Sequence, residues 1–308
     1  MSFPARPRFT WRLRSRSLPL GRRTLLAGIL NVTPDSFSDG NRFFAAGDAT
    51  DHALRMLDDG ADFIDVGGES TRPNSAPVPA GEEQSRILPV IRSILKYRPD
   101  AVLSADTYHA STAELALEAG VQIVNDVSGL LWDRGMAAVL ARYKPGAILM
   151  HTRGAPRRWQ SLPPLPHADI IPLVVLGLAH SLKLAKAAEL SPAAIVLDPG
   201  FGFGKLGDEN FTLLARISEL QQFAMPLLAG TSRKKFLTAH LTDQSDSTRL
   251  QATSASHVAA ILAGVHILRV HDIPAARAAA SIADAVLNSS HPEESAGHPS
   301  GVRHAFMS

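Results

Sequence analysis

Short apolar runs alternate with amphipathic stretches from residue 25 to residue 287. An apolar run of a few residues that ends at Gly, Pro, Asn or Asp predicts a buried strand, and apolar residues at helical spacing predict a helix. The pattern predicts eight strands, at residues 25–30, 63–66, 102–103, 121–124, 147–150, 195–197, 226–229 and 267–268. Each run delivers polar groups at its carboxyl end.

Helical patterns follow the strands, and several of them end at glycine, a favoured helix stop. We expect helices at residues 49–60, 82–95, 112–120, 136–143, 173–190, 210–220, 254–264 and 275–287. Eight strand–helix units over about 250 residues are typical of an α/β fold of the (β/α)8, or TIM barrel, type. A doubly wound sheet is the alternative, but no GxGxxG follows the first strand.

The chain before the barrel is rich in arginine, with seven arginines and no acidic residue in the first 23 positions. Phe9, Trp11 and Leu13 alternate with polar residues, which is strand periodicity. We therefore expect an N-terminal β-hairpin over one end of the barrel, with a targeting segment as the alternative. The expected organisation is an extension at 1–24, a barrel domain at 25–287, and a disordered tail at 288–308 that is rich in Ser, His, Pro and Gly.

Composition narrows the function classes. The 308 residues contain no cysteine, which excludes disulfides, thiolate metal sites and a cysteine nucleophile. The net charge is only +2, so no pervasive basic field favours nucleic acid. The longest apolar run, residues 170–179, contains Pro172 and Gly177 and is shorter than the roughly 20 residues of a membrane span. We expect a soluble, cytoplasmic protein without nucleic-acid or membrane partners.

The stretch from Ile195 to Lys205 combines a buried strand, Asp198 at its end, and a glycine-rich loop with two aromatic residues. Barrels place ligand-binding groups at the carboxyl ends of their strands. A role for Asp198 as a helix cap is the simpler alternative. The loop does not match a phosphate-binding P-loop, because Pro199 and Leu206 stand where that motif needs glycine and Ser or Thr.

The strand ends together offer a distinctive set of groups. Asp106, Asn125 and Asp198 supply hydrogen-bond acceptors for the donor-rich edge of a guanine-like or pterin-like ring, and Met150 and Phe203 could contact its faces. Five residues form a cationic set suited to phosphate or diphosphate: Arg72, Arg233, Lys234, Arg269 and His271. Taken singly, a strand-end Asn or Asp is more often a turn residue than a ligand, a lone Arg is usually a surface charge, and His271 is equally well explained by packing.

Hard oxygen ligands of the kind that Mg²⁺ accepts beside substrate phosphates are available at Asn31 and Asp35. No Ser-His-Asp order, HExxH or zinc motif competes with this reading.

Several blocks resemble signatures of the dihydropteroate synthase family. The stretch from Gly28 to Gly40, Gly-Ile-Leu-Asn-Val-Thr-Pro-Asp-Ser-Phe-Ser-Asp-Gly, resembles the first signature, and Asp65-Val-Gly-Gly-Glu-Ser-Thr-Arg72-Pro73 resembles the second. Further blocks follow in the family's order: Asn125-Asp-Val-Ser-Gly, Leu149-Met-His, Leu197-Asp-Pro-Gly-Phe-Gly-Phe-Gly-Lys205, Ser232-Arg-Lys234 and Arg269-Val-His-Asp272. The resemblance covers about residues 25 to 287.

The resemblance implies a homodimeric folate-pathway transferase. It would join 4-aminobenzoate to 7,8-dihydropterin-6-ylmethyl diphosphate, releasing pyrophosphate, by an SN1-like and Mg²⁺-assisted route. The pterin would be held by Asp198, Asn125 and Asp106, with Lys234 reaching the ring, and Gly230 would line the substrate site. The diphosphate would be held by Arg269, His271 and Asn31, with Asn31 also binding Mg²⁺.

The resemblance also implies that the loops around Asp35 and around Thr71-Arg72-Pro73 shape the aminobenzoate pocket together with Ser232. Asp35 could lie near the developing pterin cation, and Arg72 could stabilise the leaving diphosphate. Two rivals stay open. One is a pterin-dependent corrinoid methyltransferase, which needs no diphosphate site, and the other is an inactive pterin-binding protein. Sulfonamide sensitivity is a further hypothesis.

Overall fold

The computed structural model describes residue 3 and residues 5–33, 42–69 and 77–290. Ten strands and eight α-helices lie within these residues. The strands are β1 Phe9–Arg12, β2 Ser17–Leu20, β3 Leu25–Asn31, β4 Phe63–Gly67, β5 Leu103–Asp106, β6 Ile123–Asp126, β7 Gly146–Met150, β8 Ile195–Asp198, β9 Leu228–Ala229 and β10 Ile267–Val270. The α-helices are α1 Arg42–Asp58, α2 Ala80–Tyr97, α3 Ala110–Glu118, α4 Met136–Tyr143, α5 His167–Ala187, α6 Glu209–Ala215, α7 Asp246–Leu262 and α8 Ile273–Ser290. Four short 3₁₀ helices complete them: η2 Pro156–Ser161, η3 Pro192–Ala194, η4 Ile217–Phe223 and η5 Lys235–Thr238.

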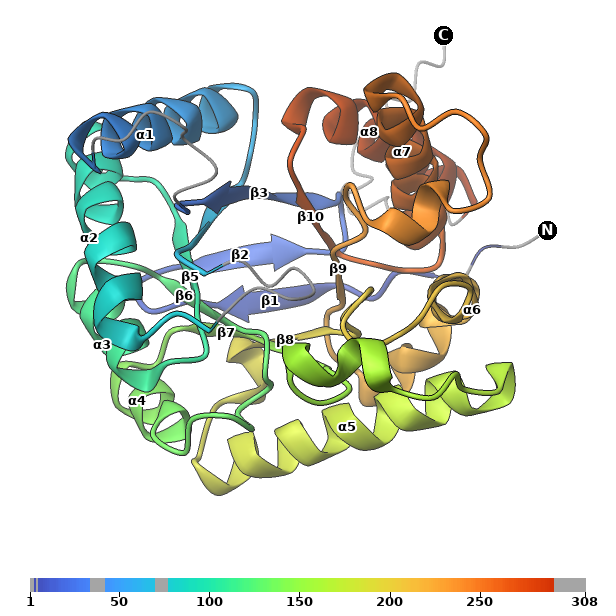
Figure 1. Cartoon of the computed structure of the whole chain (residues 1–308), viewed down its shortest axis with the longest axis horizontal. Coiled ribbons are helices and arrows are strands. Elements are labelled where there is room, and N and C mark those ends of the chain that lie inside the picture. Colours follow the sequence, from blue (N-terminus) through green and yellow to red (C-terminus); the bar gives the residue numbers. More distant parts are fainter. Residues whose placement is uncertain (1–2, 4, 34–41, 70–76, 291–308) are drawn as a thin grey trace, which may run out of the picture.

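Strands β3 to β10 form one parallel sheet in the order β8-β7-β6-β5-β4-β3-β10-β9. A parallel bridge between Leu197 and Leu227 joins its two ends and closes the barrel. The helices surround the strands, as Figure 1 shows. The predicted (β/α)8 fold is therefore confirmed.

Most helices differ from the expectation at one or both ends; α1 and α7 begin at Arg42 and Asp246, earlier than the predicted residues 49 and 254. The helix predicted over 210–220 stops at Ala215 and continues, after Arg216, as η4. Helix α8 continues to Ser290, so the first three residues of the predicted tail are helical. The remainder of that predicted tail lies outside the described residues. Helix α5 begins at His167 rather than at the predicted residue 173, so it includes Pro172, and it ends at Ala187.

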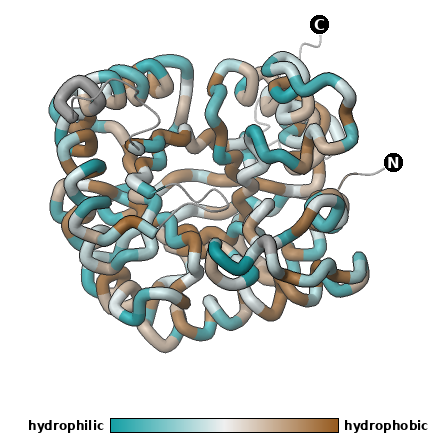
Figure 2. The backbone as a smooth tube through the Cα atoms, viewed as in Figure 1, coloured by the Kyte–Doolittle hydropathy of each residue, from teal (hydrophilic) through white to brown (hydrophobic). Residues whose placement is uncertain are grey.

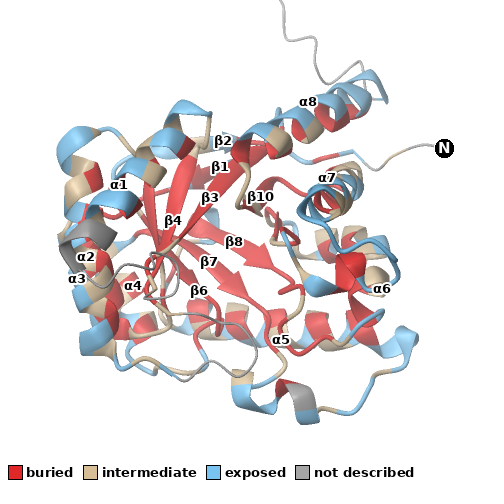
Figure 3. Ribbon diagram, turned by 45° about the horizontal axis from the view of Figure 1, so that its top comes forward, coloured by how far each residue is buried: buried red, intermediate tan, exposed pale blue. Residues whose placement is uncertain are grey.

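The inner face of the barrel changes character along its length. One apolar cluster gathers inward-facing residues at the amino-terminal end of the strands, among them Phe63, Ile123, Ile148, Val196 and Ile267. The larger cluster lies between the outer face of the sheet and the helices. Both faces of these strands are therefore buried, as expected for a parallel sheet. Figure 3 shows the central strands coloured as buried, and Figure 2 shows the hydropathy of the same segments.

The predicted N-terminal hairpin is confirmed, with β1 and β2 paired antiparallel. Trp11, Leu13 and Leu20 are buried in the same cluster as the inward-facing strand residues, so the hairpin closes the amino-terminal mouth of the barrel. The Trp11 indole donates a 2.8 Å hydrogen bond to the carbonyl of Ala194. The hairpin thus completes the core.

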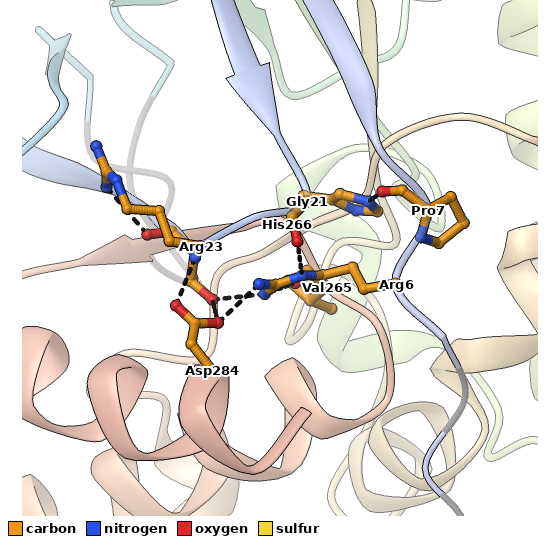
Figure 4. A network of polar contacts seen from close by, with 8 residues as sticks. Arg6, Pro7, Gly21, Arg23, Val265, His266 and Asp284 are labelled. Atoms are coloured by element: carbon orange, nitrogen blue, oxygen red, sulfur yellow. Dashed lines mark hydrogen bonds and ion pairs between the residues drawn. The ribbon is translucent and has the colours of Figure 1, made fainter. Parts of the chain in front are cut away.

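A polar network fastens this closed end (Figure 4). Arg6, only 6% exposed, donates four hydrogen bonds, to the carbonyls of Gly21 and Val265, the Thr24 hydroxyl and Asp284 Oδ1. Asp284 accepts in addition the Thr24 backbone N–H at 2.7 Å. The network ties the segment before the hairpin to α8, near the other end of the chain.

Within the part of the chain that the structure describes, α5 is the one helix long and apolar enough to cross a membrane by length and composition. Ile170, Val174 and Leu178 of this helix are fully buried, and α5 contacts β7 and α6. One third of its apolar window is buried, and Leu176 is 70% exposed, so packing in the barrel accounts for part of the apolar composition of α5.

Candidate active site

The polar side chains at the carboxyl end of the barrel lie on the same inward-facing side of the strands as the apolar cluster at the amino-terminal end. Residues two apart on a strand point to the same side of a sheet. Asp65 therefore follows Phe63, Asn125 follows Ile123, and Asp198 follows Val196 into the barrel interior. From the amino-terminal to the carboxyl-terminal end of the strands, the inward-facing side chains change from apolar ones to carboxylates, an amide and the guanidinium of Arg269.

Asp65 is the centre of the first cluster. Its carboxylate is 1% exposed, and Oδ2 accepts hydrogen bonds from Asn125 Nδ2 at 2.9 Å and from Arg269 Nε at 2.6 Å. Arg269 Nη2 in turn donates to Asp106 Oδ2 at 2.5 Å. One guanidinium thus bridges two carboxylates, and one of these carboxylates orients the Asn125 amide.

Two acceptor atoms of this cluster have no hydrogen-bond partner among the described residues: Asp65 Oδ1 and Asn125 Oδ1, both buried. Because Nδ2 of Asn125 is held by Asp65, the amide oxygen is the atom left for another group. An unpartnered buried acceptor is costly. The two oxygens are therefore available to a group that donates hydrogen bonds.

The charges in this cluster influence one another. Burial raises the pKa of Asp106 to about 7; Arg269 opposes the rise, and Asp65, Glu83 and Glu69 add to it. Burial alone would lower the pKa of Arg269, but Asp106 and Asp65 outweigh that effect and raise it. The guanidinium therefore stays charged, while Asp106 can gain a proton near neutral pH.

Asp198 lies at the end of β8 and is 4% exposed. Its Oδ1 accepts the backbone N–H of Gly200 at 2.7 Å. Burial raises the pKa of Asp198 to about 6, against the opposing effects of the Gly200 N–H and of Lys205, Lys234 and Arg269. A buried, ionisable acceptor is thus held within the field of three cations.

Lys234 and two predicted apolar residues form one wall of this region. The Lys234 ammonium lies 4.3 Å from the centroid of the Phe203 ring, a cation–π arrangement. Phe203 packs edge-to-face on Trp159, and both belong to a cluster with Met150 and Val127. Burial and Arg269 lower the pKa of Lys234 to about 8, although Asp198 and Asp106 act in the opposite direction.

Ser232 and His271 contact each other at the carboxyl-terminal end of the barrel. His271 Nδ1 lies 3.0 Å from Ser232 Oγ, and the His271 backbone N–H donates to the same hydroxyl at 3.2 Å. Gly230 lies beside Arg269, where an added Cβ would come within 3.8 Å of the arginine Cβ. Arg233, which was predicted as part of the cationic set, is exposed.

The other predicted residues divide into two groups. Asn31 ends β3, paired in register with Gly67, and is half-buried. Asp35, Thr71 and Arg72 lie outside the described residues.

Asp65 was not predicted as a site residue, although it begins a block that resembles a family signature. A carboxylate two positions after Phe63 in an otherwise apolar strand was the available signal. Trp159 and Lys205 were also missed. Trp159 was the harder of the two to find, because its contact with Phe203 bridges 44 positions and no local pattern indicates it.

The barrel and its polar end match known proteins over most of their length. Residues 27–271 match the family model described as "Pterin binding enzyme". The dihydropteroate synthase of Synechocystis is 40% identical over 266 residues, which cover 86% of this chain and 91% of that protein. The chain belongs to the dihydropteroate synthase family.

Solved structures agree with that membership. The dihydropteroate synthase of Clostridium difficile, crystallised with pteroic acid, is 42% identical, with a TM-score of 0.80 over 87% of this chain and 98% of that one. The Yersinia pestis dihydropteroate synthase, solved with a sulfonamide drug, is 37% identical, with a TM-score of 0.82 over 90% and 99% of the two chains. The family resemblance seen in the sequence is confirmed.

Proposed function

We propose that this family member joins 4-aminobenzoate to 7,8-dihydropterin-6-ylmethyl diphosphate, releasing pyrophosphate and forming 7,8-dihydropteroate. The observation that carries the proposal is the acceptor-rich end of the barrel, where Asp65, Asn125 and Asp198 are buried and two of their oxygens have no partner among the described residues. A pterin ring presents an amino group beside ring N–H groups, and these donors complement such a surface.

In this proposal Asp198 and Asn125 accept hydrogen bonds from the pterin edge, and Asp106 contributes a third acceptor or, when protonated, a donor. Phe203 and Met150 contact the ring faces, since they belong to one apolar cluster. Lys234 lies over Phe203 and reaches the ring system. Gly230 leaves space beside Arg269, because it carries no side chain.

We assign diphosphate binding to Arg269, His271 and Asn31 at the carboxyl-terminal end of the barrel. Asn31 also suits a single Mg²⁺ ligand, because Mg²⁺ in such sites takes one or two protein oxygens and otherwise water and phosphate oxygens. The described residues contain no group of three or more His, Asp, Glu or Cys side chains able to hold a metal alone. A magnesium ion bound together with the substrate would neutralise part of the negative charge of the diphosphate.

The reaction needs a stabilised leaving group more than a nucleophilic side chain. The C–O bond breaks toward an allylic-type pterin cation, and the diphosphate takes the electron pair. Arg269 and His271 stabilise the charge that develops on the diphosphate. The amine of 4-aminobenzoate is itself the nucleophile, so the protein contributes orientation and exclusion of water. Asp35 and Arg72 are assigned to the cation and the leaving group, respectively.

Ser232 is assigned to the aminobenzoate pocket together with Thr71. A sulfonamide drug resembles 4-aminobenzoate in carrying a para-substituted aniline, and one relative was solved with such a drug. We therefore expect sulfonamides to compete with 4-aminobenzoate. Turnover that is unaffected by millimolar sulfonamide would reject this expectation.

The family assignment argues against the corrinoid methyltransferase, because the named relatives are dihydropteroate synthases. The inactive pterin-binding protein is excluded only by turnover. We further assign residues 25–287 to catalysis, residues 1–24 to closure of the barrel, and the protein to the cytoplasm as a homodimer. Two apolar residues on α8 are exposed, Ile282 to 67% and Val286 to 38%, and this supports a contact between the two subunits at α8. Light scattering after gel filtration tests the dimer.

The first measurement is pyrophosphate release from purified protein given the pterin diphosphate, 4-aminobenzoate and Mg²⁺. Release that yields dihydropteroate, requires Mg²⁺ and is largely lost in Asp198→Asn is expected. Binding of pteroic acid without pyrophosphate release would contradict the synthase and leave the inactive binder.

A further inference from the structure

The glycine-rich loop after β8 surrounds a buried cation. Lys205 is 3% exposed, and its ammonium donates to three backbone carbonyls: His151 at 2.9 Å, Pro199 at 2.7 Å and Gly200 at 2.7 Å. Two of these carbonyls belong to the loop itself, and the third belongs to the residue that follows β7. Lys205 therefore joins the ends of two neighbouring strands.

The loop conformation is specific for this arrangement. Gly200, Gly202 and Gly204 have φ of +70°, +76° and +74°, a region that L side chains rarely adopt. A Cβ at Gly200 would lie 2.0 Å from the His151 carbonyl oxygen and 3.1 Å from Lys205 Nζ. In phosphate-binding loops the backbone N–H groups face an anion, whereas this loop turns its carbonyls toward a cation.

The three carbonyls also indicate the charge state of the lysine. Each accepts a hydrogen bond from Nζ, and a carbonyl cannot donate, so all three protons of an ammonium are used. Burial lowers the pKa of Lys205, Asp198 and Glu209 oppose this effect, and Lys234 and Arg153 add to it. The hydrogen-bond count requires the protonated form in spite of the burial.

Lys205 is connected to predicted substrate contacts through the backbone it holds. Gly200, whose carbonyl Lys205 binds, donates its N–H to Asp198 Oδ1 and accepts the Phe203 N–H at 3.2 Å. The Phe203 carbonyl accepts the Arg153 N–H, and Phe203 supports the Lys234 ammonium.

We propose that Lys205 is a positioning residue of the pterin site: its ammonium clamps the ends of β7 and β8 together and thereby fixes Asp198 and Phe203 where they contact the pterin. This assignment rests on the proposed function. It predicts that loss of the ammonium weakens pterin binding and leaves the aminobenzoate interaction nearly unchanged.

The absence of cysteine from the chain permits a direct test. A Lys205→Cys variant carries the single thiol of the protein. Alkylation of this thiol with 2-bromoethylamine in denaturant, followed by refolding, restores a side chain of lysine length that ends in an ammonium. Alkylation with bromoethane adds a neutral ethyl group instead. Lys235→Cys, at the exposed lysine next to Lys234, is treated in the same way as the matched control.

Binding of pteroic acid and steady-state kinetics are then measured for each form that melts cooperatively. We expect the ethylated Lys205→Cys protein to bind pteroic acid at least tenfold more weakly than wild type and to show a raised KM for the pterin diphosphate. Its KM for 4-aminobenzoate should change less than twofold. The aminoethylated form should recover to within threefold of wild type, and all Lys235→Cys forms should resemble wild type.

Equal affinity of the ethylated and aminoethylated forms would overturn the proposal, because the ammonium would then be unnecessary. A parallel loss for both substrates would also overturn it, since it would indicate a general structural role. If the ethylated form fails to refold while the aminoethylated form folds and binds, the ammonium is required for the clamp itself. Wild-type protein that does not bind pteroic acid would refute the proposed function instead.

Discussion

At the amino-terminal end of the barrel, the buried charge of Arg6 meets Asp284, a hydroxyl and two carbonyls, and no side-chain atom of that network is left buried without a partner. At the carboxyl-terminal end, Asp65 and Asn125 each keep one buried oxygen unpartnered within the described residues. The same eight strands therefore end in one region where polar groups satisfy each other and in another where they are incomplete.

The difference separates stability from function. Buried polar groups with full partners hold a structure in one arrangement, whereas unpartnered ones reduce the free energy of unfolding and stay available to a ligand. Substitutions at the amino-terminal end should reduce stability without affecting turnover. Substitutions of site residues at the carboxyl-terminal end should reduce turnover without reducing stability.

Asp198→Asn gives the largest expected effect on catalysis. Loss of a buried charge that pairs with the substrate costs about 4 kcal/mol, so kcat/KM for the pterin diphosphate should fall about 10³-fold. Because the pKa of Asp198 is raised from 3.8 to about 6 in the folded state, the free energy of unfolding falls as the pH rises between these two values, and the full cost of the ionised form is present above 6. The variant should therefore melt no lower than wild type at pH 8. A clearly lower melting temperature, or retained activity, would contradict the comparison.

Arg6→Met tests the opposite end. Removing one partner of a buried ion pair costs about 3–4 kcal/mol, because the Asp284 charge remains buried without its partner. Thermal denaturation should show a melting temperature lower by roughly 6–16 °C. At 25 °C the folded variant should keep the wild-type kcat and both KM values. A changed KM for the pterin diphosphate would show that the two ends are coupled.

The pH profile of kcat/KM sharpens the view of the carboxyl-terminal end. Below about 6 Asp198 gains a proton, and above about 8 Lys234 loses one. We expect kcat/KM for the pterin diphosphate to fall about tenfold per pH unit on either side of that range. Lys234→Arg should lack the alkaline limb, since a guanidinium does not titrate there. A flat profile between pH 5 and 9 would show that neither group acts.

Trp11→Phe should have the smallest effect. It removes the hydrogen bond to the Ala194 carbonyl and part of the apolar volume below Phe63, at a cost of about 1–2 kcal/mol. Urea denaturation should report this decrease, while turnover stays at the wild-type value. A loss of activity in the folded variant would assign the hairpin a role beyond closure.

The periodic part of this fold was predictable from sequence because strand and helix spacing are local properties. The apolar run at 195–197 predicts a strand, and the two-residue period of a strand directs Asp198 to the same side as Val196. The Arg269 ion pairs could not be predicted, since they join residues 204 and 163 positions apart. The Arg6–Asp284 pair spans 278 positions, and an arginine-rich start indicates solvent exposure rather than burial. Lys205 was visible as a residue type, but its partners are backbone carbonyls, which residue types do not reveal.

The Arg6–Asp284 pair has a consequence for biosynthesis. A ribosome adds Asp284 278 positions after it adds Arg6. At about 5–20 residues per second, the arginine waits roughly 14–56 s before its partner exists. Phe9 of the hairpin likewise packs against His266, the residue before β10, which is also made late. Closure of the amino-terminal end is therefore a late event, and a nascent chain that stops before α8 cannot complete it.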